Sequence, residues 1–497
     1  MKKILIPISL SLLITVFFVS FIELDNTSEL KEDMGIVYSV VNIPNNLSKV
    51  TNLNKNDEDF ICATSKGLVE KTKDGKIVPS LASEVNVKDD GLEYEFILKD
   101  DISWSNGEKI TSSDISKFFS ELIKVEDESN IDSILNVYGA KDFRNDKVSF
   151  EEGVAIATTE NSIKFRLNRK NEEFVEALTK PQYRVRRYLP LWEDLSISYS
   201  DIVYSGSYSI SSLDDNEMTL SKNEYSKVEG PIEITVLKDD TEELAMASFE
   251  IGNRDIVLNP PQSQLNRLKE DNKLITLPSD KGIYINLNGS ADNLSLQSRR
   301  EIYKIIYDAA EGYEGENSCR VEVAEGSYFR DDKNDLSKLQ TRKVSINQEG
   351  EWKKPDIITI LALDDDDSRD FCKYLSQYFK DKEGINLRYS LVKEDDLKDI
   401  ELQKRYDLLL FAAESNTDDR LGFYRSIEGL YSEGEEKLFK DELAKDTSNF
   451  SAMEENLFNT YRILPVMFSN NNIAISDKVS NIEFDGHGNI DFSSITK

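Results

Sequence analysis

Residues 67–123 decide the fold, and they read GLVEKTKDGKIVPSLASEVNVKDDGLEYEFILKDDISWSNGEKITSSDISKFFSELI. Asp74-Gly75 and the Asp89–Gly91 segment are turn signals, because glycine after aspartate supplies the positive φ that a tight turn needs. Residues 92–98 then alternate mostly between apolar and acidic side chains, which is typical of a half-buried strand. The first two thirds of the stretch therefore predict short strands joined by tight turns.

The last third of the stretch predicts a third turn and a capped helix. Trp104 directly precedes the turn residues Ser105-Asn106-Gly107. Thr111 and Asp114 have the spacing of a capping box, with aspartate in place of the usual glutamate. The apolar residues that follow recur at helical spacing, and they are Ile115, Phe118, Phe119, Leu122 and Ile123.

The order and spacing of these signals resemble the signature of the family 5 extracellular solute-binding proteins, the oligopeptide- and dipeptide-binding receptors of ABC importers. The matching residues are Gly67-Leu68-Val69, Asp74-Gly75, Pro79-Ser80-Leu81-Ala82, Asp90-Gly91-Leu92, Tyr94, Phe96, Leu98-Lys99, Trp104–Gly107, Thr111 and Asp114-Ile115. The resemblance implies an α/β fold of the periplasmic-binding-protein-like class II type. Such a fold has two lobes, an extra small domain and a ligand cleft between the lobes.

Further segments extend the resemblance to about residues 36–497. Apolar runs predict strands at 36–41, 283–288, 357–363, 385–392 and 406–411. Helical spacing predicts helices at 242–250 and 298–310, the second with Ser298 and Glu301 as its capping box. Strands that alternate with helices in the last third of the chain are typical of an α/β domain.

The resemblance also implies a division of the chain into domains. Residues 1–34 are expected to form a signal peptide or membrane anchor with a tether. Domain I is expected to combine residues 35–57, 201–278 and 463–497. Residues 58–200 correspond to the small domain II, and residues 279–462 to domain III.

The overall charge excludes several classes of partner. The 497-residue chain has a formal net charge of −32. Nucleic-acid binding needs Lys and Arg for phosphate contacts, and a polybasic membrane-surface patch needs them too. We therefore expect an acidic, exported protein that binds no nucleic acid. Three cysteines, without a C-x-x-C pair, do not make a disulfide framework.

Catalytic and metal-binding patterns are weak. His487 is the only histidine and lies in a glycine-flanked turn, so a Ser-His-Asp triad and histidine metal clusters are not expected. The acidic run 364–367 lacks the spacing and the distal glutamate of a calcium loop. We therefore predict no enzyme activity, no catalytic residues, no cofactor and no metal site.

The resemblance implies an extended peptide as ligand, held by pairing with strand edges and by hydrated side-chain pockets. The family's Leu-Asp-Pro motif is replaced here by residues 43–47, and its tryptophan is missing from residues 410–419. Either Glu414 or Asp418 is then the candidate partner of the peptide α-amino group. The expected ligand-binding residues are Ile43, Asn45, Asn46, Asn286, Asn288, Ala413, Glu414 and Asp418.

The functional hypothesis is therefore a monomeric peptide-binding receptor that delivers its ligand to an ABC permease at the outer face of the cytoplasmic membrane. Two alternatives stay open. One is a binder of another solute, such as an oligosaccharide, in the same fold. The other is a diverged membrane-anchored sensor or scaffold that does not transport.

The N-terminal segment favours an uncleaved anchor. Lys2 and Lys3 precede 19 uncharged residues, Ile4–Ile22, which is close to the ~20 residues that span a bilayer. The first cysteine is Cys62, so no lipoprotein signal cysteine closes this run. The two lysines and the acidic residues that follow place the body of the protein outside the cell.

We therefore expect the full-length protein to stay in the membrane fraction after washes with high salt and with alkali, because an inserted helix resists both treatments. The measurement is an immunoblot of the washed membranes and of the supernatant. Release of the full-length chain into the supernatant would contradict the anchor.

Overall fold

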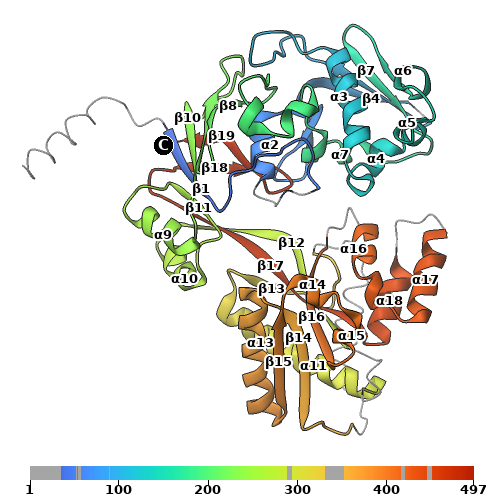
Figure 1. The fold of residues 1–497 in the computed structure, drawn as a ribbon, viewed down its shortest axis with the longest axis vertical. Coiled ribbons are helices and arrows are strands. Elements are labelled where there is room, and N and C mark those ends of the chain that lie inside the picture. Colours follow the sequence, from blue (N-terminus) through green and yellow to red (C-terminus); the bar gives the residue numbers. More distant parts are fainter. Residues whose placement is uncertain are drawn as a thin grey trace, which may run out of the picture. The chain divides into compact units, whose positions relative to one another are not determined.

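A computed structural model describes residues 35–51, 53, 57–88, 90–287, 294–330, 352–415, 420–444 and 450–496. The chain forms two compact units (Figure 1). Unit 1 comprises the described residues up to Ile256 together with those from Ser476, and unit 2 comprises Val257–Ile475. The first predicted segment, residues 1–34, lies outside the described residues, and so do Asn288 and Asp418.

The small sheet of unit 1 contains the stretch that decides the fold. Strands β4 (Ala82–Val87), β5 (Glu93–Leu98), β7 (Ser162–Arg166) and β6 (Ile156–Thr158) form an antiparallel sheet in that order. Helix α3 (Ser112–Val125) packs on it, with the rings of Phe119 and Phe165 5.1 Å apart. Thr111 and Asp114 form the predicted capping box. The predicted alternating strand and capped helix are confirmed.

The remaining elements of this part of unit 1 are short. They are α2 (Glu58–Thr64), β2 (Val69–Lys71), β3 (Ile77–Pro79), η1 (Glu128–Asn130), α4 (Asp132–Leu135), α5 (Ala140–Arg144), α6 (Phe150–Gly153), α7 (Phe174–Ala177), η2 (Pro181–Tyr183), η3 (Leu189–Trp192) and α8 (Leu195–Ser198). Trp104 is fully buried in the core beneath β5 and α3.

A second group of paired strands in unit 1, part of an 11-stranded sheet, is built around the first predicted strand. Strand β1 (Gly35–Val40) is parallel to β10 (Glu233–Lys238). Strands β9 (Glu217–Lys222) and β8 (Tyr208–Leu213) continue the sheet in antiparallel fashion. Helix α9 (Glu242–Glu250) has the predicted bounds, and the Thr241 side chain caps it. Strand β11 (Ile256–Leu258) contains the residue at which unit 1 gives way to unit 2.

The C-terminal hairpin, β18 (Asn481–Phe484) and β19 (Ile490–Thr496), attaches to unit 1 through buried polar contacts. The Asp59 carboxylate accepts hydrogen bonds from the Tyr38 hydroxyl and from the Ile490 backbone N–H, both at 2.9 Å. In the hairpin turn, the Asp485 carboxylate lies 3.4 Å from the Arg184 guanidinium. These contacts fix a segment that is more than 400 residues away from α2 in sequence.

Unit 2 contains a mixed sheet with the strand order β15-β14-β16-β12-β17, and β13 (Val321–Val323) pairs with β17. The strands are β12 (Leu274–Leu287), β14 (Ile357–Leu363), β15 (Asn386–Val392), β16 (Leu408–Glu414) and β17 (Ile463–Ile475). The helical elements are α10 (Gln262–Glu270), α11 (Leu296–Asn317), α13 (Asp366–Tyr378), η4 (Phe379–Glu383), α14 (Glu394–Leu397), α15 (Ile400–Gln403), α16 (Arg420–Ser426), η6 (Glu428–Leu430), α17 (Glu433–Ala444) and α18 (Ser451–Asn459).

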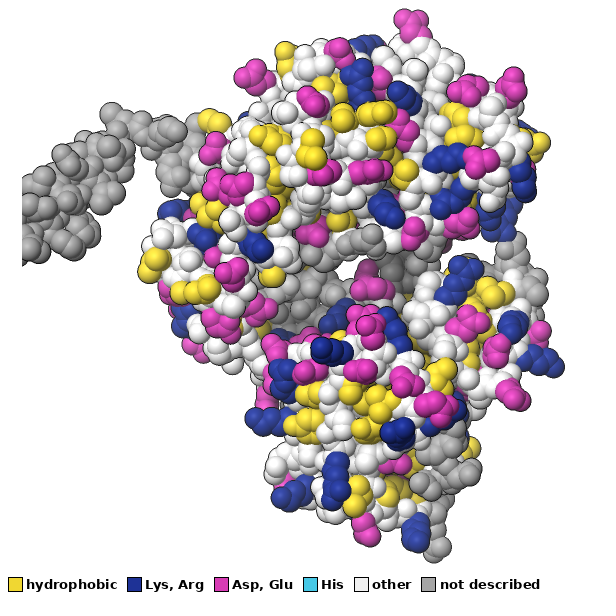
Figure 2. Space-filling view, in the orientation of Figure 1, with side chains coloured by type: hydrophobic (Ala, Val, Ile, Leu, Met, Phe, Trp, Pro, Cys, Tyr) yellow, Lys and Arg dark blue, Asp and Glu magenta, His cyan; other side chains and the backbone are white. Residues whose placement is uncertain are grey.

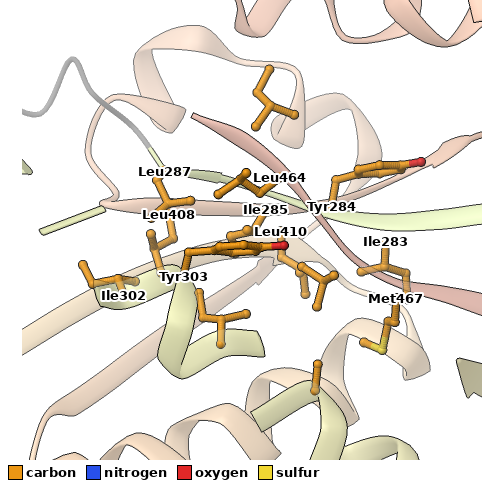
Figure 3. Packing of buried hydrophobic residues seen from close by; sticks show 14 of the residues in the cluster. Ile283, Tyr284, Ile285, Leu287, Ile302, Tyr303, Leu408, Leu410, Leu464 and Met467 are labelled. Carbon is orange, nitrogen blue, oxygen red and sulfur yellow. The ribbon is translucent and has the colours of Figure 1, made fainter. Parts of the chain in front are cut away.

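Strand β14 is parallel to both of its neighbours, β15 and β16, whereas β12 is antiparallel to β16 and β17. Figure 3 shows the core that results, in which Ile302 and Tyr303 of α11 pack against Ile285 of β12 and Leu408 of β16. The apolar runs that predicted β14 and β16 thus place consecutive buried residues in the centre of the sheet, whereas β15 at its edge is mostly exposed or half-buried.

One predicted helix start is wrong. Helix α11 begins at Leu296 and not at Ser298, and its cap is Ser295, whose hydroxyl accepts a hydrogen bond from the Ser298 backbone N–H at 3.1 Å. Ser298 therefore lies inside the first turn. Both serines satisfy the cap pattern, and the pattern alone does not distinguish them.

Among the described residues, no helix combines the length and the apolar character needed to cross a membrane. The division into domains I, II and III is finer than the two units and stays a prediction.

The Asp485 network generates a pH prediction. Burial alone would raise the pKa of the Asp485 carboxyl, but the Arg184 guanidinium and hydrogen bonds from Asn489 outweigh it and hold the pKa below its usual value. A carboxyl whose pKa is lower in the folded chain than in the unfolded chain, where it is about 3.9, stabilises the fold above that value. This stabilisation is lost as the pH falls through the folded-state pKa.

We expect Asp485→Asn to lower the free energy of unfolding at pH 7 by about 1–3 kcal/mol, the usual cost of a lost buried charged hydrogen bond. As the pH falls below about 4 the difference from the wild type should shrink, because the wild-type carboxyl takes up a proton first in the unfolded chain and, at lower pH, in the folded chain. Calorimetric melting between pH 7 and pH 3 measures both effects. Asp100→Asn, at an exposed side chain, is the control and should change neither. An unchanged pH dependence in Asp485→Asn would contradict this role.

Candidate functional site

The predicted ligand-binding residues of unit 1 lie in the loop after β1. Asn45 uses both ends of its side chain: the amide N–H donates to the Asp194 carboxylate at 3.1 Å, and the amide oxygen accepts from the Ser196 backbone N–H at 2.8 Å. The Asn46 amide oxygen accepts from the backbone N–H of Ser48 at 3.0 Å and from its hydroxyl at 2.8 Å. Ile43 is half-buried. The polar groups of this loop thus fix its own conformation.

The predicted residue Asn286 lies near the end of β12, where it is paired with Leu409 of β16 and Ile463 of β17. It is only 6% exposed. Its side-chain oxygen has no hydrogen-bond partner among the described residues. An orphaned buried acceptor costs about 1–3 kcal/mol, so this oxygen is suited to receive a donor.

Ala413 and Glu414 form the carboxyl end of β16, where they pair with Gly282 and Lys281 of β12. The next residue, Ser415, is buried and donates from both its backbone N–H and its hydroxyl to the Asp280 carbonyl, at 2.7 and 2.6 Å. The end of the strand is therefore held in place, and the Glu414 side chain is exposed at this edge of the sheet.

This edge is also a topological switch point. The neighbours of β14 are β15 on one side and β16 on the other, and all three strands run parallel. In open α/β sheets, ligands bind outside the carboxyl ends of strands at such a point. Glu414 ends β16 there, and the acidic run that starts at Asp364 follows β14 at the same edge.

The acidic run after β14 is paired with basic side chains. Asp365 caps α13 through the Ser368 backbone N–H. Arg369 contacts Asp364 at 2.7 Å and also pairs with Asp366. Asp367 pairs with Arg320 and lies 3.7 Å from Lys281. Within the described ranges, no group of three or more His, Cys, Asp or Glu side chains could hold a metal ion.

The surface is acidic in net charge but mixed in pattern. Figure 2 shows acidic and basic side chains side by side on the visible face of each unit. The excess of acids therefore does not form one uniform field on this face, and local pairs decide the electrostatics.

A buried ion pair fixes α16, the helix that follows the predicted ligand segment 412–419. Arg420 and Glu454 are 2.6 Å apart, with side chains that are 10% and 2% exposed. The Arg420 guanidinium also lies over the Phe329 ring, 4.4 Å from its centroid. The sequence analysis missed this pair, because nothing local to either residue indicates a partner 34 residues away.

Comparisons with known proteins agree with this architecture. The family model "Bacterial extracellular solute-binding proteins, family 5 Middle" matches residues 76–303. The oligopeptide-binding protein OppA of Bacillus subtilis (strain 168) is 24% identical over 240 residues, which cover 44% of this chain and 43% of OppA. The alignment thus spans less than half the length of this curated relative.

Two solved structures share the fold. The unliganded open form of MppA, a periplasmic murein tripeptide binding protein, has a TM-score of 0.68 at 14% identity, covering 94% of this chain and 98% of MppA. Listeria monocytogenes OppA bound to peptide has a TM-score of 0.63 at 14% identity, covering 94% of this chain and 100% of OppA.

These matches confirm the fold class, an α/β solute-binding fold of the two-lobe class II type. They also confirm the predicted resemblance to the family 5 extracellular solute-binding proteins. The family model that matches residues 76–303 describes solute-binding proteins, and the two solved structures share the fold of such proteins.

The buried pair beside the ligand segment generates a stability prediction. We expect Glu454→Gln to lower the free energy of unfolding by about 3–5 kcal/mol, because it removes the carboxylate charge that lies 2.6 Å from the buried Arg420 guanidinium. Urea denaturation measures the change. Glu394→Gln, which removes an exposed pair with Lys398, is the matched control and should leave stability unchanged within error. Equal stability of both variants would contradict the role of Glu454.

Proposed function

We propose that this protein binds peptides and delivers them to the permease of an ABC importer. Relatives in the family are named for oligopeptides, dipeptides and a murein tripeptide. The observation that carries the proposal is the position of Glu414 at the carboxyl end of β16, beside the switch point of the unit 2 sheet. A carboxylate there is suited to pair with the α-amino group of a peptide.

The remaining predicted residues complete the proposed ligand site. Asn286 offers a buried oxygen that could accept a peptide N–H. The shape of the site would be set in part by Ile43, Asn45, Asn46 and Ala413. Two further candidates, Asn288 and Asp418, lie outside the described residues. The ligand would lie in a cleft between the lobes of a monomer that acts at the outer face of the cytoplasmic membrane, held there by its N-terminal segment.

The electrostatics favour a free amino terminus. A charge-assisted hydrogen bond contributes about 1.5–3 kcal/mol, which corresponds to roughly tenfold or more in affinity. Backbone pairing of the peptide with strand edges would supply affinity that does not depend on its sequence.

The test is isothermal titration calorimetry of the full chain with penta-alanine and with N-acetyl-penta-alanine. We expect penta-alanine to bind and acetylation to weaken binding about tenfold or more, since it removes the charge that Glu414 would pair with. Glu414→Gln should weaken binding of penta-alanine and leave the acetylated peptide unaffected.

The matched control is Glu401→Gln, an exposed glutamate of α15 that pairs with Lys404 and should not alter binding. Absence of heat with tri- to hexapeptides of either charge would overturn the proposal. Binding of maltopentaose without any peptide binding would instead support the oligosaccharide alternative.

A further inference from the structure

The loop after β1 passes two fully buried, oppositely charged side chains of unit 1. Arg186 and Glu126 are both 0% exposed. Burial of a charge is costly unless hydrogen bonds compensate for it, so each of these groups must be satisfied by its surroundings. The sequence analysis singled out neither residue.

The hydrogen bonds of the Arg186 guanidinium go to backbone carbonyl oxygens. It donates to the backbone carbonyl of Leu47, to that of Gln182 at 3.0 Å and to that of Arg184 at 3.4 Å. Burial lowers its pKa to about 10, while the Glu126 carboxylate opposes this shift, so the group stays charged at neutral pH. The positively charged Arg186 side chain thus holds the backbone carbonyl of Leu47 at one end of the loop.

The Glu126 carboxylate contacts the far end of the same loop. It accepts from the Val50 backbone N–H at 2.7 Å and from the Thr51 hydroxyl. Asn130 and the Asp127 backbone N–H complete its shell, at 3.0 and 3.1 Å. Burial alone would raise the pKa of Glu126, but these hydrogen bonds outweigh it and lower the pKa. The negatively charged Glu126 side chain thus holds the Val50 backbone N–H and the Thr51 hydroxyl at the other end of the loop.

The two anchors are linked into one network. Gln182 accepts from Arg186 through its carbonyl, and its side-chain N–H donates to the Asn130 carbonyl at 2.7 Å. Asn130 in turn donates to Glu126. The loop segment 47–51 is therefore held at one end by a cation and at the other by an anion, and the Leu47 backbone N–H is bonded to the Trp192 carbonyl at 2.8 Å.

We propose that Arg186 and Glu126 are positioning residues, which hold residues 43–51 in one conformation and thereby set the affinity of the loop for ligand. The effect on affinity rests on the proposed peptide-binding function, whereas the hold on the loop does not. Neither side chain touches ligand in this proposal, because both are fully buried. A pre-ordered loop loses less conformational freedom on binding, and this raises affinity.

The test is hydrogen–deuterium exchange of the full-length protein, read for peptides that cover residues 43–51, in Arg186→Met and Glu126→Gln. Arg184→Met is the matched control. Arg184 lies two residues from Arg186 and is equally charged and buried, but it contacts Ser65 and Asp485 and not the loop. We expect exchange in the loop to rise about tenfold or more in Arg186→Met and Glu126→Gln, and to stay at the wild-type rate in Arg184→Met.

Calorimetry with penta-alanine supplies the second readout. We expect Arg186→Met to weaken binding about tenfold, and Arg184→Met to leave it within about twofold. If Arg186→Met does not fold, Arg186→Lys keeps the charge with fewer donors and should give smaller changes in the same direction.

The outcomes separate the two proposals. Unchanged loop exchange, or an equal increase in Arg184→Met, would overturn the positioning role. Faster loop exchange with unchanged penta-alanine affinity would overturn the link to binding. If the wild type binds no peptide at all, the proposed function fails, and the exchange rates alone still decide whether the two charges hold the loop.

Discussion

Unit 2 depends on the pairing of β12 with β17. These are its longest described strands, and their segments are almost 200 residues apart in sequence. Strand β12 also pairs with β16, so it connects the C-terminal strand to the parallel part of the sheet. A sheet cannot leave buried backbone groups unpaired without a large cost, and loss of this pairing would expose both ladders.

A proline in β17 interrupts the hydrogen bonds between β12 and β17. Pro465 lies in the buried first half of this strand, where it cannot donate to the ladder. The register between β12 and β17 shifts at this point, so the missing donor coincides with a β-bulge. The Pro465 carbonyl accepts instead from the hydroxyl of Tyr303 on α11, at 2.8 Å. The β-bulge therefore accommodates the missing N–H of Pro465, and the hydrogen bond from α11 satisfies its carbonyl.

Unit 1 uses buried charges for a related purpose. Asp59, Glu126 and Arg186 are each buried, and each bonds to backbone groups of a segment outside the main sheets: Asp59 to the C-terminal hairpin, and Glu126 and Arg186 to the loop after β1. Such buried charges contribute little net stability compared with apolar packing. They raise the free energy of any conformation in which they lose their hydrogen-bond partners. These hydrogen bonds thus hold the loop after β1 and the C-terminal hairpin each in one position, although neither belongs to the main sheets.

The sequence predicted a good part of the candidate site, but only as separate segments. Hydrophobic runs predicted strands at 283–288 and 406–411, which correspond to parts of β12 and β16, and Glu414 was named because the resemblance places the partner of the peptide amine in that segment. That Glu414 faces Lys281, and that Asn286 keeps an oxygen without a partner among the described residues, follow from strand register. Register is set by distant strands and not by local pattern.

By itself, the sequence determined the turns, strands and capped helix of residues 67–123, and through them the resemblance to the family 5 solute-binding proteins. These features depend on φ preferences, hydrophobic periodicity and cap chemistry, all of which act within a few residues. Only the tertiary structure decided which charges became buried anchors. Arg186 and Arg184 look alike in sequence, yet one bonds the loop after β1 and the other the C-terminal hairpin. Burial and partners are properties of the packed chain, because desolvation depends on segments that are remote in sequence.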